Sequence, residues 1–256
     1  MALYKSILVA KTDLKMALQV SYVKYGLIMV AALGPIMILA IVGLMAFTIS
    51  PTNPTELIVV MEIMNPSIAP MLGIVAIIPA SLIAANAFVG EREQNTLEPL
   101  LCTPLTDREL LIGKVLSSFI PSMALLLGSI IASEVGTVAL LLLAGHAPLL
   151  FPDIAGLFLL LTAAPLMILA MNSIMILISG RVSRVYEAYQ TSGATVMIFI
   201  IPMILPYFSL GSGGTIDPSS IWFSNIITVL ISLALFLVTW ALAFGRFNRD
   251  KMVSLI

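Results

Sequence analysis

Charged residues and cysteines are scarce in this chain of 256 residues. Only 10% of the residues are charged, whereas 60% are hydrophobic, and the mean hydropathy is +1.13. Soluble domains carry about 25% charged residues, so this composition disfavours a soluble enzyme. The single cysteine, Cys102, cannot form an intrachain disulfide, and a net charge of -1 offers no attraction for polyanions. A secreted disulfide scaffold and a nucleic-acid binder are therefore disfavoured as well.

Motifs for catalysis and for metal or nucleotide binding are also missing. One histidine and one cysteine cannot build a His/Cys metal site, and the chain has no HExxH motif. Its long apolar runs contain no aspartate, and no serine stands in a GxSxG setting. Gly113-Lys114 is similar to the end of a phosphate-binding loop, but Arg108 stands where that motif needs glycine. We therefore expect no catalytic residue, no metal and no cofactor in this chain itself.

The chain instead has six long apolar runs. A helix needs roughly 20 residues to cross a hydrocarbon core about 30 Å thick, and each run reaches that length. Glu134 is the only charged side chain in them. The sequence thus predicts an all-α polytopic membrane protein. The predicted spans are 26–49, 67–90, 115–143, 154–180, 189–210 and 221–245, within a transmembrane domain 26–245 followed by a tail 246–256.

Basic residues are confined to one side of these spans. All 12 lysines and arginines lie in alternate connections, and the positive-inside rule assigns those connections to the cytoplasm. We therefore expect a multi-pass protein of the cell membrane with both termini cytoplasmic. The basic segments are 1–25, 91–114, 181–188 and 246–256; the connections without Lys or Arg are 50–66, 144–153 and 211–220, whose ionisable residues are Glu56, Glu62, His146, Asp153 and Asp217.

The lead-in 1–25 has an amphipathic pattern. Residues 4–25 can be drawn as one helix with a polar stripe and an apolar side, although Leu8 and Asp13 interrupt the pattern. This predicts a helix in the inner membrane interface; the alternative is a solvated lead-in that only anchors the first span. The first apolar run begins near Gly26 and is itself of span length, so no cleavable signal peptide is expected. The polar stripe is Lys11, Lys15 and Gln19, beside Lys5 and Thr12, and the apolar side is Ile7, Leu14, Leu18 and Tyr25.

The connection 91–114 contains signals for two short helices. Asn95 can cap the first of them. Thr106 and Glu109 form an S/T-x-x-E capping box, which predicts a second helix that continues into the third span. Pro104 lies between the two and keeps them separate. A helix, turn, helix element is therefore expected between the second and third spans.

Three leucines give the first of these short helices an apolar edge among charged residues. Leu97, Leu100 and Leu101 form this edge, and an apolar edge rimmed by charge suits a groove on another protein. The alternative is that the leucines lie on the membrane surface or against other spans.

The order of residues in 91–114 resembles a known signature. It runs Glu91-Arg92-Glu93, Asn95-Thr96-Leu97-Glu98, Leu100-Leu101, Thr103-Pro104 and Gly113-Lys114. Type-2 permeases of ATP-binding-cassette (ABC) exporters carry a similar cytoplasmic pattern of E-R-E, G-T-L-E, two leucines, a proline and a later G-K. Asn95 stands where the family usually has glycine, and asparagine also tolerates a left-handed turn. A second, weaker likeness runs from Ser179 to Arg184, followed by Glu187-Ala188.

The resemblance implies a partner and a role for this connection. In such exporters two permease subunits, identical or related, assemble with two cytoplasmic ATP-binding subunits, and ATP and Mg²⁺ bind to those partners. The segment between spans two and three would be the coupling element that contacts the ATPase. The residues assigned to it in this way are Glu91, Arg92, Glu93, Asn95, Thr96, Leu97, Glu98, Leu100, Leu101, Pro104, Glu109, Gly113 and Lys114, with Arg181, Arg184 and Glu187 as a second cytoplasmic contact.

A few small and polar residues interrupt the apolar spans. Small residues recur every four positions in the second and third spans, which favours close helix packing within one subunit or at a dimer seam. Asn86, Glu134 and Asn172 are candidates for lining a substrate pathway; the alternative is a helix-to-helix hydrogen bond or a place near the outer interface. The two small-residue stripes are Ala76, Ala80 and Ala84, and Gly128, Ala132 and Gly136.

Together these features favour the membrane subunit of an ABC exporter that works by alternating access. Two other classes stay open. A secondary transporter or channel would need no ATPase and would use Glu134 as its coupling group. A membrane scaffold would use 91–114 to recruit a cytoplasmic partner without transport.

Overall fold

All regular structure in the part of the chain that is described is helical, which confirms the predicted all-α class. The computed structural model describes residues 2–49, 54–90, 93, 106–179, 181–182, 184–208 and 218–246. Its elements are α1 (Ala2–Gln19), α2 (Ser21–Thr48), α3 (Pro54–Ala85), the π-helix η1 (Asn86–Gly90), α6 (Asp107–Leu143), α7 (Ile154–Ser179), α8 (Val185–Phe208) and α9 (Pro218–Arg246).

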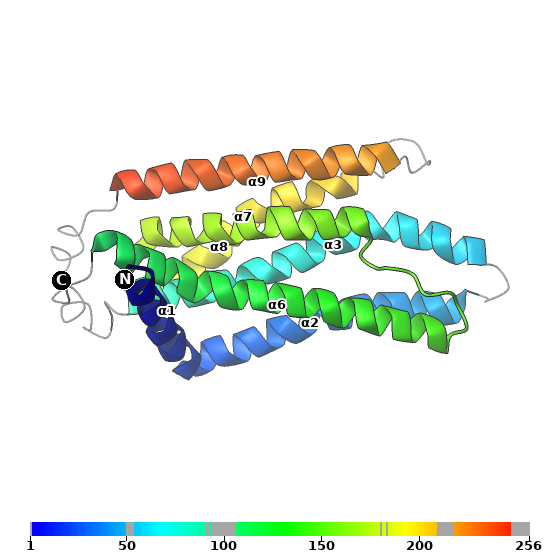
Figure 1. Ribbon diagram of the computed structural model, residues 1–256, viewed down its shortest axis with the longest axis horizontal. Coiled ribbons are helices and arrows are strands. Elements are labelled where there is room, and N and C mark those ends of the chain that lie inside the picture. Colours follow the sequence, from blue (N-terminus) through cyan, green and yellow to red (C-terminus); the bar gives the residue numbers. More distant parts are fainter. Residues whose placement is uncertain are drawn as a thin grey trace.

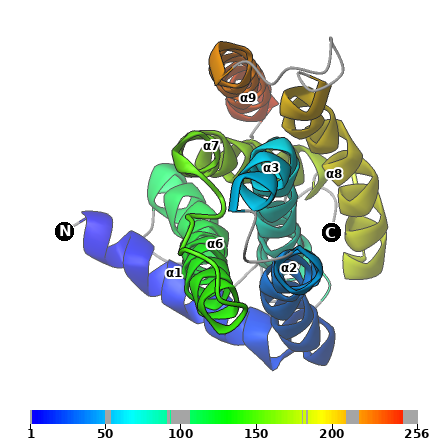
Figure 2. The same ribbon diagram turned by 90° about the vertical axis from the view of Figure 1, so that its right-hand side faces the viewer.

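The long helices form a bundle around α3 and α7. The α3 helix packs against α2, α6, α7 and α8, while α7 also packs against α9 (Figures 1 and 2). The α1 helix is different, because it runs crosswise in the view that shows the long helices end-on, and it packs against α6 (Figure 2). The bundle thus has a crosswise helix at the end where α2 and α6 begin.

Five segments of the described chain are long and apolar enough to cross a membrane, which confirms a polytopic membrane protein. The helix α8 covers residues 189–208 of the predicted span 189–210, but several of its side chains lie outside the described residues. The count of six spans therefore stays a prediction. The five segments are Ser21–Thr48, Ile68–Gly90, Arg108–Leu143, Ile154–Ser179 and Ser219–Ala243.

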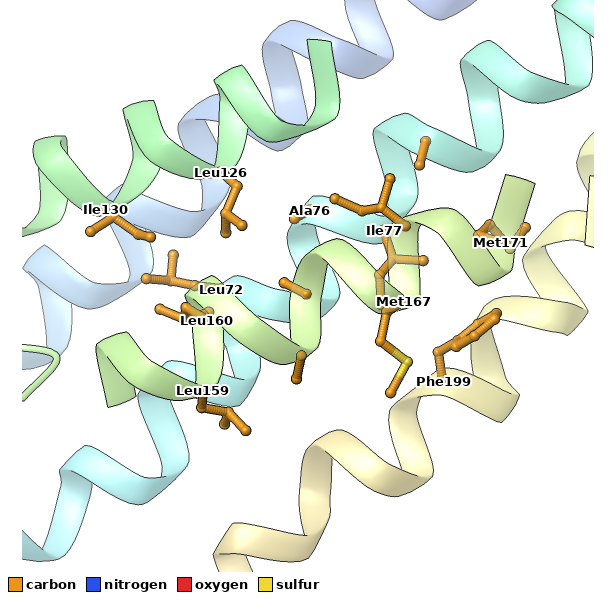
Figure 3. Packing of buried hydrophobic residues seen from close by; sticks show 14 of the residues in the cluster. Leu72, Ala76, Ile77, Leu126, Ile130, Leu159, Leu160, Met167, Met171 and Phe199 are labelled. Carbon is orange, nitrogen blue, oxygen red and sulfur yellow. The ribbon is translucent and has the colours of Figure 1, made fainter. Parts of the chain in front are cut away.

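The apolar core lies where α3, α6, α7 and α8 meet. Leu72 and Ile77 from α3 contact a cluster that includes Leu160 and Met167 of α7 and Phe199 of α8 (Figure 3). Each of these side chains is fully buried. Burial of this kind excludes both water and lipid, so the centre of the bundle packs as a soluble core does.

The two small-residue stripes pack differently. Every member of the α3 stripe, Ala76 to Ala84 at four-residue spacing, is buried in the core, so this stripe serves packing within the chain. Of the two glycines in the α6 stripe, Gly136 is in close contact with Leu39 of α2. Gly128 and Ala132 are exposed on the bundle surface, and a Cβ added at Gly128 would meet nothing within 4 Å.

Two element boundaries differ from the sequence-based expectation. The helix drawn over 4–25 is broken at Val20, whose backbone is extended (φ -74°, ψ 115°), so residues 21–25 belong to α2. The break turns α1 onto α6, and no glycine or proline marks it. The connection 50–66 is largely helical, because α3 begins at Pro54, which suits a first helical turn, and buries Leu57 and Met61 four residues apart.

Candidate functional site

The predicted capping box opens α6. The Oγ1 of Thr106 accepts the Glu109 backbone N–H at 3.3 Å, and the Glu109 carboxylate accepts the Thr106 N–H at 3.0 Å. The α6 helix then continues without a break to Leu143. At about 1.5 Å per residue its 37 residues extend beyond a 30 Å hydrocarbon core, so a rigid helix joins the connection 91–114 to the third span.

Gly113 lets α1 approach α6 closely. A Cβ at this position would lie 2.8 Å from Val9 Cβ and 2.9 Å from the Ser6 backbone oxygen. In the same contact the Ser6 hydroxyl donates to the Glu109 carbonyl at 3.0 Å. Because part of the obstruction is backbone, any larger residue at Gly113 must move α1 away from α6.

Lys114 is a buried cation that joins three elements. It is only 5% exposed, and its Nζ lies 3.8 Å from the Asp13 carboxylate of α1. The ammonium also donates to the Ala87 carbonyl of η1 and lies 5.7 Å from the centre of the Phe88 ring. A cation is favourable there because the carbonyls at the end of a helix carry partial negative charge. Lys114 therefore ties α1 and η1 to α6.

Glu93 joins the predicted coupling element to α8. Its carboxylate accepts the Val185 backbone N–H at 2.8 Å, across 92 residues of sequence. Val185 is the first residue of α8, whose opening N–H groups have no partner within the helix. The carboxylate thus caps α8, and its negative charge interacts favourably with the positive N-terminal end of the helix dipole. Arg184 and Glu187 flank this contact on exposed positions, so the two predicted cytoplasmic segments meet at one end of the bundle.

Asn86 belongs to the same end. It begins η1, and its Nδ2 donates both to the Leu82 carbonyl at 3.1 Å and to the Tyr189 hydroxyl of α8. A cavity of about 740 Å³ opens beside this pair. Asn86 is thus a pathway candidate that lines a sizeable cavity.

Asn172 and Glu134 lie elsewhere. Asn172 is fully buried, and its Oδ1 accepts the Ser118 hydroxyl of α6 at 2.7 Å, which is a helix-to-helix hydrogen bond. Glu134 lies 16 residues beyond Ser118 on α6, about 24 Å along the axis, and accepts the Phe151 backbone N–H at 3.2 Å. The three polar side chains therefore do not converge on one site.

The loop that Glu134 contacts is held by further side chains. The His146 ring nitrogen Nε2 lies 3.0 Å from the Ala46 carbonyl of α2. Asp153 accepts the Gly156 N–H at 2.7 Å and so caps the start of α7. The segment 144–153 is thus attached to α2, α6 and α7.

The remaining coupling residues named from the sequence lie outside the described residues. Among the described residues, no group of three His, Cys, Asp or Glu could hold a metal ion. Arg181 is exposed beside the end of α7. The coupling residues outside the description are Glu91, Arg92, Asn95, Thr96, Leu97, Glu98, Leu100, Leu101 and Pro104.

Sequence reasoning missed two parts of this site. Asp13 interrupts the amphipathic pattern of the lead-in, and that interruption is the signal in the sequence of its buried contact with Lys114. Tyr189 and Tyr22 stack with ring centres 5.0 Å apart, and no spacing in the sequence indicates that contact.

A comparison with protein families identifies the family of this chain. A family model described as "ABC-2 family transporter protein" matches residues 15–212, which include both segments predicted to be cytoplasmic. The chain belongs to this ABC-2 transporter family. It is a membrane permease component of an ABC transporter, and permeases of this family normally work with an ABC ATPase subunit. A search of curated proteins gave no match.

Proposed function

We propose that this chain is the membrane subunit of an ABC exporter that moves its substrate outward by alternating access. Two copies, or one copy and a related chain, would assemble with two ATP-binding subunits, and those subunits would bind ATP and Mg²⁺. This proposal rests on the family match together with the resemblance of 91–114 to an exporter signature. The chain itself would break no covalent bond.

The distribution of basic residues supports an orientation. The described lysines and arginines lie in α1, at the starts of α2 and α6, between α7 and α8, and at the end of α9. All of these positions belong to the end of the bundle near α1 (Figure 1). By the positive-inside rule this end faces the cytoplasm, where an ATPase would contact it. The membrane would be the cell membrane.

The buried contacts of Lys114 carry the proposal of coupling. The segment 91–114 connects η1 to α6, and Lys114 fixes both to α1. Glu93 adds α8 through its bond to Val185. A displacement of this segment by an ATPase would therefore move four helices as one body, which is how a rigid-body transition is transmitted.

The polar side chains divide into pathway and scaffold roles. Asn86 lines a cavity at the basic end, so we assign it to the pathway. Asn172 and Glu134 hold neighbouring elements together through the hydrogen bonds described above. An apolar bundle of this kind favours amphipathic or lipid-like cargo.

Copurification tests this function. The tagged permease would be purified from membranes of its native host, and native mass spectrometry would measure the mass of the complex and identify any ABC ATPase bound to it. We expect two permease and two ATPase subunits. A cysteine at Gln190 in a Cys102→Ser background should then change its reactivity toward a thiol reagent with ATP and Mg²⁺ but not without nucleotide. A permease that purifies alone and shows no ATP-dependent change would contradict the proposal.

A further inference from the structure

A cavity at the basic end of the bundle has the composition of a ligand site. It lies between the start of α2, the start of η1, Glu93 and the first two turns of α8, and its volume is about 740 Å³. Sites for drug-sized molecules span about 300–1,000 Å³. The helices α2 and α8 that flank it lie on the same side of the bundle (Figure 2). Its lining residues are Val20, Tyr22, Asn86, Glu93, Val185, Tyr186, Tyr189 and Gln190.

Three tyrosine rings line this cavity. Tyr22 and Tyr189 lie with ring centres 5.0 Å apart and planes tilted by 37°. Tyr186 is one helical turn before Tyr189 on α8, and its hydroxyl accepts the Gln190 amide at 3.1 Å. Asn86 binds the Tyr189 hydroxyl and so holds that ring in place. Aromatic faces carry negative potential and attract cations within about 6 Å.

The charged side chain in the lining is negative, as are the faces of the tyrosine rings. Glu93 is the charged member of the described lining, which includes neither Lys nor Arg. Its carboxylate is fixed at the edge of the cavity by the Val185 N–H at 2.8 Å. The rings and the carboxylate therefore both favour a positive group. Val20 and Val185 add apolar surface, and the neighbouring helices continue into the membrane.

We propose that this cavity binds an amphipathic organic cation, with its charged head over the tyrosine rings near Glu93 and its apolar part between α2 and α8. The inference deepens the proposed function, because it gives the substrate class of the exporter and places its capture at the end of the bundle that carries the basic residues. Tyr22 is 61% exposed and Tyr186 is 68% exposed, so both rings are open to a ligand that arrives from water or from the inner leaflet.

Equilibrium dialysis of the purified chain in zwitterionic nanodiscs tests the site without an ATPase. The probe is methyltriphenylphosphonium, and neutral triphenylphosphine oxide, of nearly the same shape, is the comparison ligand. Empty nanodiscs give the lipid background. We expect one saturable site for the cation and binding about tenfold tighter than that of the oxide.

Matched variants locate that binding. Tyr22→Leu keeps apolar bulk but removes the ring face, so affinity for the cation should fall about fivefold, whereas Tyr22→Phe should bind within about twofold of the parent. Glu93→Gln should also weaken the cation about fivefold and leave the oxide unchanged. Equal binding of cation and oxide, no saturable binding above empty nanodiscs, or equal affinity of Tyr22→Leu and Tyr22→Phe would each overturn the proposal.

The result is separable from the proposed function. If the chain assembles with its ATPase but fails this binding test, the proposed substrate class is wrong and the proposed exporter function stands. If the chain binds the cation but purifies without an ATPase, the proposed binding site stands and the proposed exporter function is wrong.

Discussion

Lys114 belongs to the motif in the connection 91–114, yet its side chain is buried and holds helices together. Its ammonium is buried between Asp13, the Ala87 carbonyl and the Phe88 ring, so its charge is satisfied by the chain itself. A charge removed from water at this depth is tolerated only when it is paired and hydrogen-bonded. The G-K pair at the end of 91–114 therefore positions α6 and α1, and a contact with an ATPase would fall to the residues before it.

Removing one partner of this ion pair should cost more than removing both. Lys114→Met leaves the Asp13 carboxylate buried without its cation, and we expect a loss of about 3 kcal/mol in the free energy of unfolding. The double variant Asp13→Asn with Lys114→Met buries no charge and should recover at least half of that loss. Thermal unfolding of the detergent-solubilised protein measures both. Equal losses for the single and the double variant would show that the pair is not the source of the effect.

The two glycines of α6 offer a second test at this scale. Gly113→Ala places a methyl group against Val9 and the Ser6 backbone, and overpacking of this kind costs about 1–3 kcal/mol. Gly128→Ala is the matched control, since its Cβ meets nothing within 4 Å and alanine favours a helix by up to about 1 kcal/mol. Unfolding temperatures should thus move in opposite directions. A stable Gly113→Ala would mean that α1 does not pack tightly on α6.

At the scale of elements, Glu134 links α6 to the loop that leads into α7. Its carboxylate accepts the Phe151 N–H, and the amide oxygen of glutamine can accept the same bond. We therefore expect Glu134→Gln to retain transport and assembly. Glu134→Leu removes the acceptor, so amide hydrogen exchange in 144–153 should become faster.

A loss of transport in Glu134→Gln with intact assembly would contradict this assignment. It would instead show that the ionisable carboxyl takes part in the transport cycle, as a proton-coupled mechanism requires.

Hydropathy predicted the helices better than it predicted their ends. The capping box at Thr106 is a local signal, and α6 begins where that signal places it. The break at Val20 has no glycine or proline to mark it, and it accompanies the packing of α1 against α6, a contact between segments distant in sequence. The early start of α3 at Pro54 was missed because the predicted span covers only the apolar part of a longer helix.

The candidate site was predictable in composition but not in contacts. Of the residues that the motif in 91–114 assigns to a coupling element, the described Glu93 and Lys114 lie at the basic end of the bundle. Their partners Val185, Asp13 and Ala87 are distant in sequence, and only the fold brings them together. Pairing across such distances leaves no periodic pattern in a single sequence.

At the scale of the whole molecule, the basic end defines an orientation that labelling can test. In a Cys102→Ser background, single cysteines at Pro148 and Gly213 should react with an impermeant maleimide in intact cells. A cysteine at Gln94 should react only after permeabilisation, because the positive-inside rule assigns the basic connections to the cytoplasm. Labelling of Gln94→Cys in intact cells would reverse the orientation and remove the coupling segment from the ATP-containing compartment.

The central claim is that 91–114 couples this permease to an ATPase. Leu97 and Leu101 are four residues apart, on one face of the predicted short helix, and would enter a groove of the ATPase. Replacing both with Asp would bury two charges without partners, at a cost of several kcal/mol. Gln94→Asp is the control, because it adds a charge at the polar start of the same segment.

The most direct measurement is copurification of the ATPase with these variants from membranes. Leu97→Asp with Leu101→Asp should insert and dimerise as the parent does, since no predicted span is altered, but should lose the ATPase and ATP-dependent transport. Gln94→Asp should retain both. A double variant that still binds its ATPase and transports at the parent rate would contradict the coupling role of this segment.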